Sequence, residues 1–368
     1  MKILHCHSTF SLGGKEARAV RLMNAFGGQA EHVILSAVPD ALSARDAIDP
    51  GIRVNFPGDN APALYGTPSL ARYARLSRYM QQFDLVLTYN WGSMDAVGAH
   101  RVFTPFRRLP RLIHHEDGFN ADESGGLSTK RNRFRRFMLP TAQHLVVPSR
   151  QLEAVAVSVW KQPANRVIRI PNGIDVARYL APPEPDIIPG FSRAPGDVIV
   201  GTLAGLRGVK NLARLVRAVA AQPPHVKLVI VGEGPERAGI AAEAARLGIA
   251  KRLIMAGFLA APHRYVGHFD IFALSSDSEQ FPISLVEAMA AGLPAVSTDV
   301  GDVKTMVAAA NARFVVPAND EAAFAQALGE LIAHGDLRTA LGEANRKIAR
   351  ERYDESAMIA CYRALYGI

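Results

Sequence analysis

The sequence predicts an α/β protein with two domains, each built on a doubly wound parallel sheet. Its 368 residues exceed the usual length of one domain, so two domains of roughly 180 residues are expected. Short apolar runs alternate with helical segments along the chain, which is typical of parallel strands joined by helical crossovers. Five prolines fall between positions 181 and 195, and they indicate a linker over 181–196.

The first domain is expected to span residues 1–180. Its strands are short apolar runs bounded by turn residues, and its helices carry good helix formers. The strands are predicted at 2–7, 31–37, 53–56, 84–88, 111–115, 144–148 and 166–170. The helices are predicted at 16–26, 69–82, 130–138 and 151–160, with a Pro/Gly/Asn-rich loop at 57–68.

The second domain is expected to span residues 197–351 by the same signals. Its strands are predicted at 198–203, 226–231, 252–255, 270–275, 294–298 and 314–317. Its first helix is predicted to follow the loop 204–211 and to end at 221. Further helices are predicted at 284–291, 320–333 and 336–350, and a last helix at 354–366 follows this domain.

Composition restricts the class of protein. Hydrophobic residues make up 49% and charged residues 21%, as in ordinary soluble globular proteins. Cys6 and Cys361 lie at opposite ends, which favours a reducing compartment and no disulfide framework. We expect neither a signal peptide nor a membrane span, because a strand begins at Lys2 and no apolar run approaches 18 residues. The expected location is cytoplasmic.

Positive charge is concentrated in the first half of the chain. Residues 1–180 hold 23 Lys and Arg against 14 Asp and Glu, whereas the remainder holds 19 against 20, and the whole chain carries +8. Such asymmetry indicates contact with an anionic surface or a polyanion. No helix-turn-helix, zinc-finger or RNA-reading motif accompanies the charge, so nucleic acid is not an expected partner.

The chain is organised around the stretch 275–299. Glu279 and Glu287 stand eight positions apart within a predicted strand, loop, helix and second strand. Ligands of open parallel sheets bind where such loops leave the carboxyl ends of the strands. We expect Glu279 in the loop and Glu287 two turns into the helix, both toward the ligand. The spacing alone would equally fit two solvated acids.

The residues from Glu279 to Val296, E-Q-F-P-I-S-L-V-E-A-M-A-A-G-L-P-A-V, resemble the Glu-x7-Glu motif of the retaining glycosyltransferases of family 4, also called glycosyl transferases group 1. This resemblance implies a GT-B fold, in which two Rossmann-like domains face each other across a cleft. It implies that Glu279 faces the donor sugar and that Glu287 accepts hydrogen bonds from ribose hydroxyls. Phe281, Pro282 and Ile283 would complete the donor side, and a final helix at about 352–368 would return to the first domain.

Two further loops of the second domain fit the same family. Arg207 and Lys210 stand three apart near a helix start, where cations and free N–H groups can clamp a diphosphate, although surface charges could also show this spacing. The resemblance assigns this pair to the leaving-group phosphates, beside Gly205. The run Gly232-Glu233-Gly234-Pro235 lacks the dinucleotide-binding fingerprint. The resemblance places Gly232 and Glu233 at the donor, and Gly257 with Phe258 at the base.

The loop 8–15 after the first strand contains Gly13 and Gly14, which let a ligand approach the backbone or simply form a tight turn. With Glu16 they match the Gly-Gly-x-Glu of the family, which faces the cleft, and Lys15 is assigned to the acceptor. Asn90 and Trp91 follow another strand. Trp91 either caps the core or belongs to the acceptor site.

Residues 114–119 form a titratable cluster at a strand end. Many family members carry a histidine next to a glycine in this loop. Here Asp117 precedes Gly118 and His115 lies two residues earlier, so either is a candidate for the catalytic position, and Glu116 is assigned to the acceptor.

The segment 130–138 mixes five basic residues with Phe134 and Phe137. It fits a helix that rests on anionic lipid headgroups, and it equally fits a core-packing helix with a solvated basic back.

Taken with the resemblance, these observations predict a transferase that moves a sugar from a UDP- or GDP-sugar to a glycan or lipid-linked acceptor of the cell envelope. The resemblance implies retention of configuration. No metal is expected, because ligand residues with metal-site spacing are not repeated along the chain. Arg207, Lys210 and helix N-termini would then meet the leaving-group charge. Two alternatives stay open, namely a nucleotide-sugar epimerase of the same fold and a non-catalytic binder of nucleotide sugars or polyanions.

Overall fold

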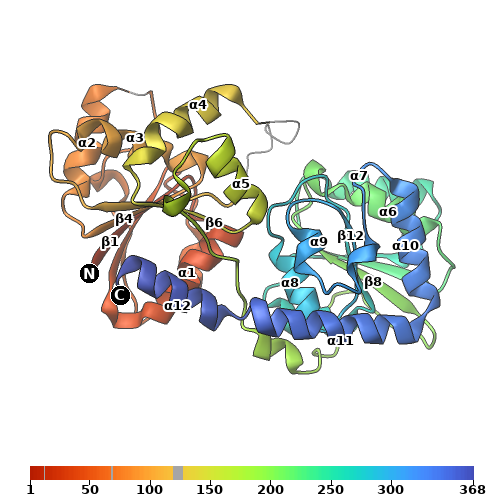
Figure 1. Cartoon of the computed structure of the whole chain (residues 1–368). Helices are drawn as coiled ribbons and strands as arrows, with labels where there is room; N and C mark the ends of the chain where they lie inside the picture. The colour runs from red at the N-terminus through yellow and green to blue at the C-terminus, as the bar shows by residue number, and fades with distance from the viewer. Residues whose placement is uncertain (12, 68, 119–126) are drawn as a thin grey trace. The chain divides into compact units, whose positions relative to one another are not determined.

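The computed structural model describes residues 1–11, 13–67, 69–118 and 127–368 (Figure 1). The chain forms two compact units, described here as the first and second unit. The first contains Met1–Asn172 and Met358–Ile368, and the second contains Gly173–Ala357. Leu12, Pro68 and Phe119, which fall in predicted loops, lie outside the described residues.

The first unit contains a seven-stranded parallel sheet in the order β3-β2-β1-β4-β5-β6-β7. Its strands are β1 (Lys2–His7), β2 (Glu31–Ser36), β3 (Arg53–Asn55), β4 (Leu85–Tyr89), β5 (Arg111–His115), β6 (His144–Val147) and β7 (Val167–Arg169). Its helices are α1 (Gly14–Phe26), α2 (Leu70–Met80), α3 (Met94–Phe103), α4 (Thr129–Met138), α5 (Arg150–Ser158) and most of α12 (Glu355–Tyr366).

Helices cover both faces of this sheet, so its central strands are buried along most of their length. Leu4 and Val86 point into a core shared with α2, α3 and α5. Ile3 and Leu87 point to the opposite side, into a core shared with α1 and α12. Figure 1 shows α1 and α12 on one face of the sheet and α2 and α3 on the other.

The second unit contains a six-stranded parallel sheet in the order β10-β9-β8-β11-β12-β13. Its strands are β8 (Val198–Leu203), β9 (Val226–Val231), β10 (Leu253–Gly257), β11 (Ile271–Leu274), β12 (Ala295–Thr298) and β13 (Val315–Val316). Its helices are α6 (Leu212–Ala220), α7 (Arg237–Arg246), α8 (Ile283–Ala290), α9 (Val303–Met306), α10 (Glu321–Ala333) and α11 (Gly335–Arg352).

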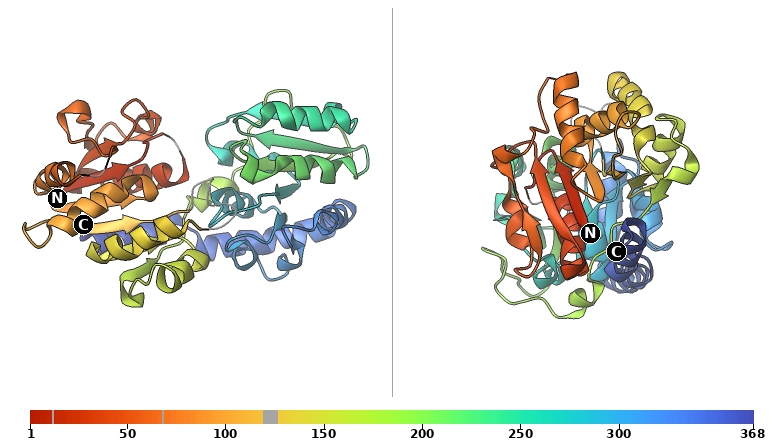
Figure 2. Two further views of the ribbon diagram at one scale, coloured as in Figure 1. Left: turned by 90° about the horizontal axis from the view of Figure 1, so that it is seen from above. Right: turned by 90° about the vertical axis from the view of Figure 1, so that its left-hand side faces the viewer.

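The second sheet is also covered on both sides. Helices α6, α7 and α10 bury one apolar face, and α8, α9 and α11 bury the other. Figure 2 shows the sheet of each unit between its helical layers. The predicted fold class, two doubly wound parallel sheets, is therefore confirmed.

The unit boundary differs from the predicted linker. The chain passes from the first unit to the second at Asn172–Gly173 and returns within α12. Tyr179 and Ile188 are buried in the core of the second unit. The proline-rich segment 181–196 is thus part of that unit, because its apolar side chains find a core to pack on, whereas composition alone shows only that it is neither helix nor strand.

Candidate functional site

The strand orders place a topological switch point in each unit. In the first unit the order reverses between β1 and β4, and in the second between β8 and β11. Loops leaving the carboxyl ends of such strands form the usual ligand site of an open α/β sheet. The predicted site residues lie at the carboxyl ends of strands or in the loops and helices that follow them.

An ion pair joins the two loops at the switch point of the second unit. Lys210 follows β8, Glu279 follows β11, and Nζ of Lys210 donates to Oε1 of Glu279 over 2.5 Å. The same oxygen accepts a 2.7 Å hydrogen bond from the Ser276 hydroxyl. The two charged side chains are 17% and 12% exposed, so they are partly shielded yet open to a ligand. The structure therefore brings together two residues that are 69 positions apart.

Further bonds hold these two loops in register. Asn211 has φ 42°, and its side chain accepts from the Arg214 backbone N–H and donates to Asp277 over 3.1 Å. The Ser275 hydroxyl donates to the Lys210 carbonyl over 3.0 Å. The sequence analysis assigns no role to Asn211 or Ser276, although asparagine is a residue that tolerates positive φ and so signals such a turn.

Arg207 lies beside this ion pair in sequence and is exposed. A Cβ on Gly205 would lie 3.6 Å from Arg207 Nε, so the guanidinium folds back along the loop. Within the described residues, the Arg207 side chain has no carboxylate partner. Its charge is therefore available to a ligand anion.

The glycines after β9 are required by close backbone packing. Gly232 and Gly234 have φ of 143° and 157°, and added Cβ atoms would lie 1.9 Å from the Ala204 carbonyl oxygen and 2.4 Å from that of Leu206. The Leu206 N–H donates to the Glu233 carbonyl over 2.9 Å. The loop after β8 therefore rests directly on the loop after β9.

The end of β10 lies beside the same loop. The Gly232 N–H donates to the Gly257 carbonyl over 2.8 Å, and a Cβ on Gly257 would lie 3.1 Å from Glu233 Oε1. The Glu233 carboxylate pairs with Arg237 over 3.0 Å at the surface. Phe258 is 64% exposed, which leaves a large aromatic face available for stacking.

Helix α8 starts directly after the loop that holds Glu279. Pro282 is its N-cap residue and makes no side-chain cap bond, because a proline side chain has no acceptor. Ile283 is the first helical residue and is half-buried, and the Phe281 side chain is buried edge-on against Tyr353. Burial, and then the charge of Glu287 on α8, raises the pKa of Tyr265.

In the first unit, Gly13 precedes α1 and Gly14 is its first residue. A Cβ on Gly13 would lie 3.0 Å from Glu16 Oε2. Burial raises the pKa of Glu16 despite the adjacent Lys15 ammonium, which is ion-paired with it. The Lys15 charge is thus balanced by Glu16 in this structure.

Asn90 and Trp91 join neighbouring segments of the first unit. Asn90 has φ 54°, and its side-chain oxygen accepts from the Asp117 N–H over 2.7 Å. Trp91 packs edge-on against Phe134, with the Arg135 guanidinium 5.2 Å from its ring centre. Trp91 is therefore a half-buried packing residue, which favours the first of its two interpretations.

His115 is buried beneath α12. Its Nδ1 donates to the Thr88 carbonyl over 3.3 Å, so Nε2 accepts from the Tyr366 hydroxyl over 2.8 Å. Burial and then the Arg18 charge hold the pKa of His115 well below its usual range. The predicted catalytic position at His115 is thus occupied by a neutral core histidine.

Glu116 is also fully buried, and its assignment to the acceptor is not supported by its placement. The Arg135 guanidinium donates to both carboxylate oxygens over 3.1 and 3.2 Å, and His114 lies 3.3 Å away. Burial acts to raise the pKa of Glu116, but Arg135 and His114 hold it below the usual value. Glu116 therefore anchors α4 to β5.

Asp117 remains as the partly exposed acid of this cluster. The Arg18 guanidinium donates to both of its oxygens and, over 3.0 Å, to the Asn172 side chain. Asp117 raises the pKa of Arg18 against the effect of burial. Sequence analysis missed Arg18, whose only signal is its place one turn after the Gly13-Gly14 pair.

The described residues form neither a metal-binding cluster nor a membrane-spanning helix. Across the described ranges, no cluster of three or more His, Cys, Asp or Glu side chains is arranged to hold a metal ion. In that same part of the chain, no helix has the length and apolar character needed to cross a bilayer.

Comparison with known proteins defines the class of protein. Residues 12–178 match the family described as Glycosyltransferase Family 4, and residues 185–348 match Glycosyl transferases group 1. Structures of HepE from Anabaena in complex with UDP and with UDP-glucose superpose with a TM-score of 0.78, at 18% and 19% identity, over 100% of both chains. The fold is therefore that of the GT-B glycosyltransferases. The chain belongs to glycosyltransferase family 4.

Curated relatives show which activities occur among similar chains. D-inositol 3-phosphate glycosyltransferase of Nocardia farcinica is 28% identical over 282 residues, which cover 71% of this chain and 61% of the relative. The lipopolysaccharide core biosynthesis glycosyltransferase LpsE of Rhizobium meliloti is 28% identical over 153 residues, 42% of this chain and 45% of the relative. The chain spans about half the length of the curated relatives it matches.

Proposed function

We propose that this chain transfers a sugar, with retention, from a UDP- or GDP-sugar to an acceptor hydroxyl. The observation that carries the proposal is the Lys210–Glu279 pair at the switch point of the second unit, beside the unpaired Arg207 charge. The similar HepE structures are complexes with UDP and with UDP-glucose, which supports the choice of donor class.

Arg207 and Lys210 stabilise the leaving nucleoside diphosphate. Both follow β8, and the loop that carries them is fixed by the Gly232 and Gly234 contacts. Charged donors that are held in place before the reaction act on developing negative charge without reorganising. Glu279 holds Lys210 in position and lies where a donor sugar would present its hydroxyl groups.

The nucleoside is bound by the neighbouring loops. Glu287 accepts hydrogen bonds from the ribose hydroxyls, since a carboxylate is an acceptor with room for two donors. The exposed Phe258 ring and the backbone after Gly257 contact the base. Glu233, paired with Arg237, borders that position.

The reaction replaces one bond at the anomeric carbon by another on the same face of the sugar. The bond from that carbon to the diphosphate oxygen breaks, and the acceptor oxygen bonds to the carbon. The departing phosphate oxygen takes the proton of the acceptor hydroxyl. Arg207 and Lys210 supply the positive charge for this step, which needs neither a protein nucleophile nor a metal.

A panel of nucleotide sugars tests the proposed reaction. The purified protein should slowly hydrolyse one UDP- or GDP-sugar, and NMR should show that the released sugar first has the anomeric configuration of the donor. An added acceptor should divert the sugar to a new glycoside. Donor consumption that yields an epimer and ignores every acceptor would favour the epimerase, and no consumption at all would favour the non-catalytic binder.

The acceptor is proposed to be a glycan or lipid-linked intermediate of the cell envelope, reached from the cytoplasm at an anionic membrane surface. The first half of the chain carries the positive excess, and one similar relative is named for lipopolysaccharide core biosynthesis. Lys130, Arg133, Arg136 and Phe137 are exposed on α4. Arg135 must be removed from the predicted membrane-binding set, because it is buried against Glu116.

Liposome flotation tests this surface. Changing Arg133 and Arg136 to Ser should weaken binding to anionic vesicles, because each basic residue near such a surface contributes about 1 kcal/mol. The control changes Arg350 and Arg352, two exposed arginines of the second unit, to Ser. Equal effects of the two pairs, or no binding of the wild type at low salt, would make a soluble acceptor the better proposal.

A further inference from the structure

A pocket of about 410 Å³ opens in the first unit at the amino ends of β5 and β6. The predicted ligand loops follow the carboxyl ends of strands, so this pocket lies at the opposite edge of the sheet. Its volume is within the range of small-molecule sites. None of the predicted site residues lines it, and the proposed transfer does not use it.

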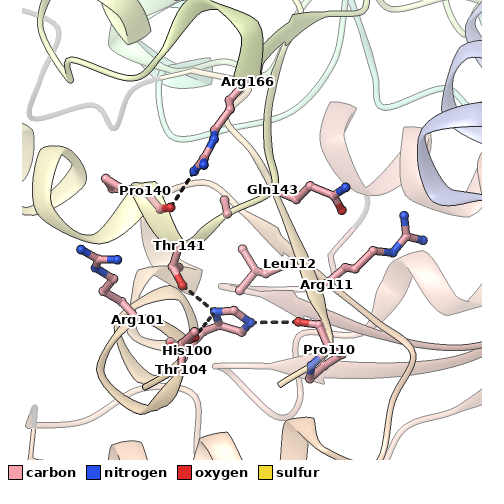
Figure 3. Close-up of a pocket in the computed structure, with 11 residues that line it drawn as sticks. His100, Arg101, Thr104, Pro110, Arg111, Leu112, Pro140, Thr141, Gln143 and Arg166 are labelled. Atoms are coloured by element: carbon pink, nitrogen blue, oxygen red, sulfur yellow. Dashed lines mark hydrogen bonds between the residues drawn. The ribbon is translucent and has the colours of Figure 1, made fainter. Parts of the chain in front are cut away.

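Three arginines line this pocket, and its lining contains no acidic residue. Arg101 comes from α3, Arg111 begins β5, and Arg166 precedes β7. Figure 3 shows Arg101 and Arg111 on opposite sides, with Arg166 directed toward Pro140. Throughout the described residues, none of these three guanidinium groups has a carboxylate partner.

The pocket is held in shape by hydrogen bonds to uncharged acceptors. Nε2 of His100 donates to the Pro110 carbonyl over 2.9 Å, and Nδ1 accepts from the Thr141 hydroxyl over 2.7 Å (Figure 3). Arg166 donates to the Pro140 carbonyl over 3.0 Å, and Arg111 donates to the Tyr366 carbonyl over 2.7 Å. These bonds fix two guanidinium groups without neutralising them.

The local field is positive. Burial lowers the pKa of the neighbouring His144, and the charges of Arg111 and Arg166 lower it further. A guanidinium has five donors in a planar fork that matches phosphate oxygens, so several arginines around one pocket suit a phosphate better than a neutral ligand.

We propose that this pocket binds a phosphate group through Arg101 and Arg166, with Arg111 adding to the field. Two exposed phenylalanines are close in sequence to residues that line the pocket. Phe106, 78% exposed, belongs to the loop between the pocket residues Thr104 and Pro110, and Phe137, 63% exposed, precedes Pro140 by three positions. Rings beside a phosphate site favour a phospholipid headgroup as the source. That source rests on the proposed membrane acceptor, whereas phosphate binding itself does not.

The test uses the full chain and sn-glycerol 3-phosphate as the soluble probe in calorimetry. Changing Arg101 and Arg166 to Ser should weaken binding at least about 10-fold, the loss expected when charge-assisted bonds are removed. The control is again Arg350→Ser with Arg352→Ser, which removes the same charge from exposed positions that do not line the pocket. Equal losses in both pairs, or no loss in either, would overturn the pocket. Arg101→Ser alone, which breaks no hydrogen bond of the described structure, serves if the double variant does not fold.

Flotation with phosphatidylglycerol vesicles distinguishes the two sources. If vesicle binding also falls for the Arg101 and Arg166 variant, relative to the control, the ligand is a lipid headgroup. If only the soluble probe is lost, the pocket takes a free phosphate ester. Hydrolysis of the nucleotide sugar should stay unchanged in this variant, so failure of the pocket and failure of the proposed transfer are separate results.

Discussion

Charged side chains of the candidate site are held by neighbours of the same unit. Lys210 is paired with Glu279 at 2.5 Å, and Asp117 is held by both nitrogens of the Arg18 fork. Such pairing limits the side-chain freedom that a ligand would otherwise have to restrict on binding. Arg207 lacks such a pairing in the described structure. A bound diphosphate is therefore expected to restrict the Arg207 side chain more than those of Lys210 and Asp117.

Glu287→Ala should weaken nucleotide binding more than Glu279→Ala does. Hydrogen bonds to a charged acceptor are worth about 1.5–3 kcal/mol, and only Glu287 is proposed to accept from the nucleotide itself. Calorimetry with UDP and GDP measures the difference, with Glu343→Ala, an exposed acid of α11, as the control. Affinities for the Glu287 variant that equal those of wild type would remove this residue from the site.

The sequence shows that the end of β5 is titratable but not which side chain meets a ligand. His115 and Glu116 are consecutive, and successive side chains of a strand point to opposite faces. His115 meets Tyr366, 251 positions away, and Glu116 meets Arg135 on α4. Neither partner is visible from local pattern, because both contacts depend on how distant helices cover the sheet.

The loops after β8 and β9 pack directly against each other, backbone against backbone. A Cβ at position 232 would lie 1.9 Å from the Ala204 carbonyl oxygen, and the φ of 143° is one that side chains rarely adopt. The loop that carries Arg207 therefore depends on a glycine in a different loop.

Gly232→Ala should lower the free energy of unfolding by about 1–3 kcal/mol, the scale of backbone strain, and should weaken nucleotide binding. Thermal melting and calorimetry check both effects. Gly239→Ala is the matched control, because Gly239 lies in α7 with only Glu236 Oε2 within 4 Å of an added Cβ, and alanine favours a helix. A Gly232 variant as stable as the Gly239 variant would contradict this packing.

Strand β1 ends in a buried histidine that affects stability. Neither ring nitrogen of His7 has a hydrogen-bond partner in the described structure, and the ring stacks on Tyr89 at 4.0 Å. Burial, and then the charge of Lys15, holds the pKa of His7 well below its usual range. Below about pH 6.5 the unfolded chain therefore binds a proton that the folded chain does not. The free energy of unfolding decreases as the pH decreases.

His7→Phe should keep the stacking and make this fall shallower. The wild type loses up to about 1.4 kcal/mol per pH unit through this one group, so urea unfolding at pH 7.5, 6.5 and 5.5 should separate the two proteins. His225→Phe, at an exposed position, should leave the slope unchanged. A His7 variant with the slope of the wild type would show that His7 is protonated in the folded state.

Periodicity predicts most strands to within one or two residues but does not predict α3 or α7. In α3, Gly98 resembles a helix breaker in the sequence. The structure needs a glycine here because Tyr73 packs against this position, with the Tyr73 hydroxyl 3.0 Å from where a Cβ would be. In α7, Ile240 and Ala244 are the buried residues, so its apolar stripe is too weak to identify. Both helices are determined by neighbours rather than by their own sequence.

At the scale of the whole molecule, each unit combines a predicted parallel sheet with a different charge. The excess of Lys and Arg over Asp and Glu lies within residues 1–180. The remainder of the chain, which holds the proposed donor residues, has a net charge close to zero. Net charge affects partner attraction and not the fold. The division suits a protein whose second unit binds a soluble nucleotide and whose first unit meets an anionic partner.

In the proposed reaction, Arg207 and Lys210 of the second unit stabilise the leaving nucleoside diphosphate without a metal. The most direct measurement is release of the nucleoside diphosphate from the preferred donor at saturation, with EDTA present. Wild type and an Arg350→Ala control should be unaffected by EDTA, while Arg207→Ala and Lys210→Ala should each be slower by about 10²–10³. Turnover of the Arg207 variant within a few-fold of wild type, or activity that EDTA removes and Mg²⁺ or Mn²⁺ restores, would contradict the claim.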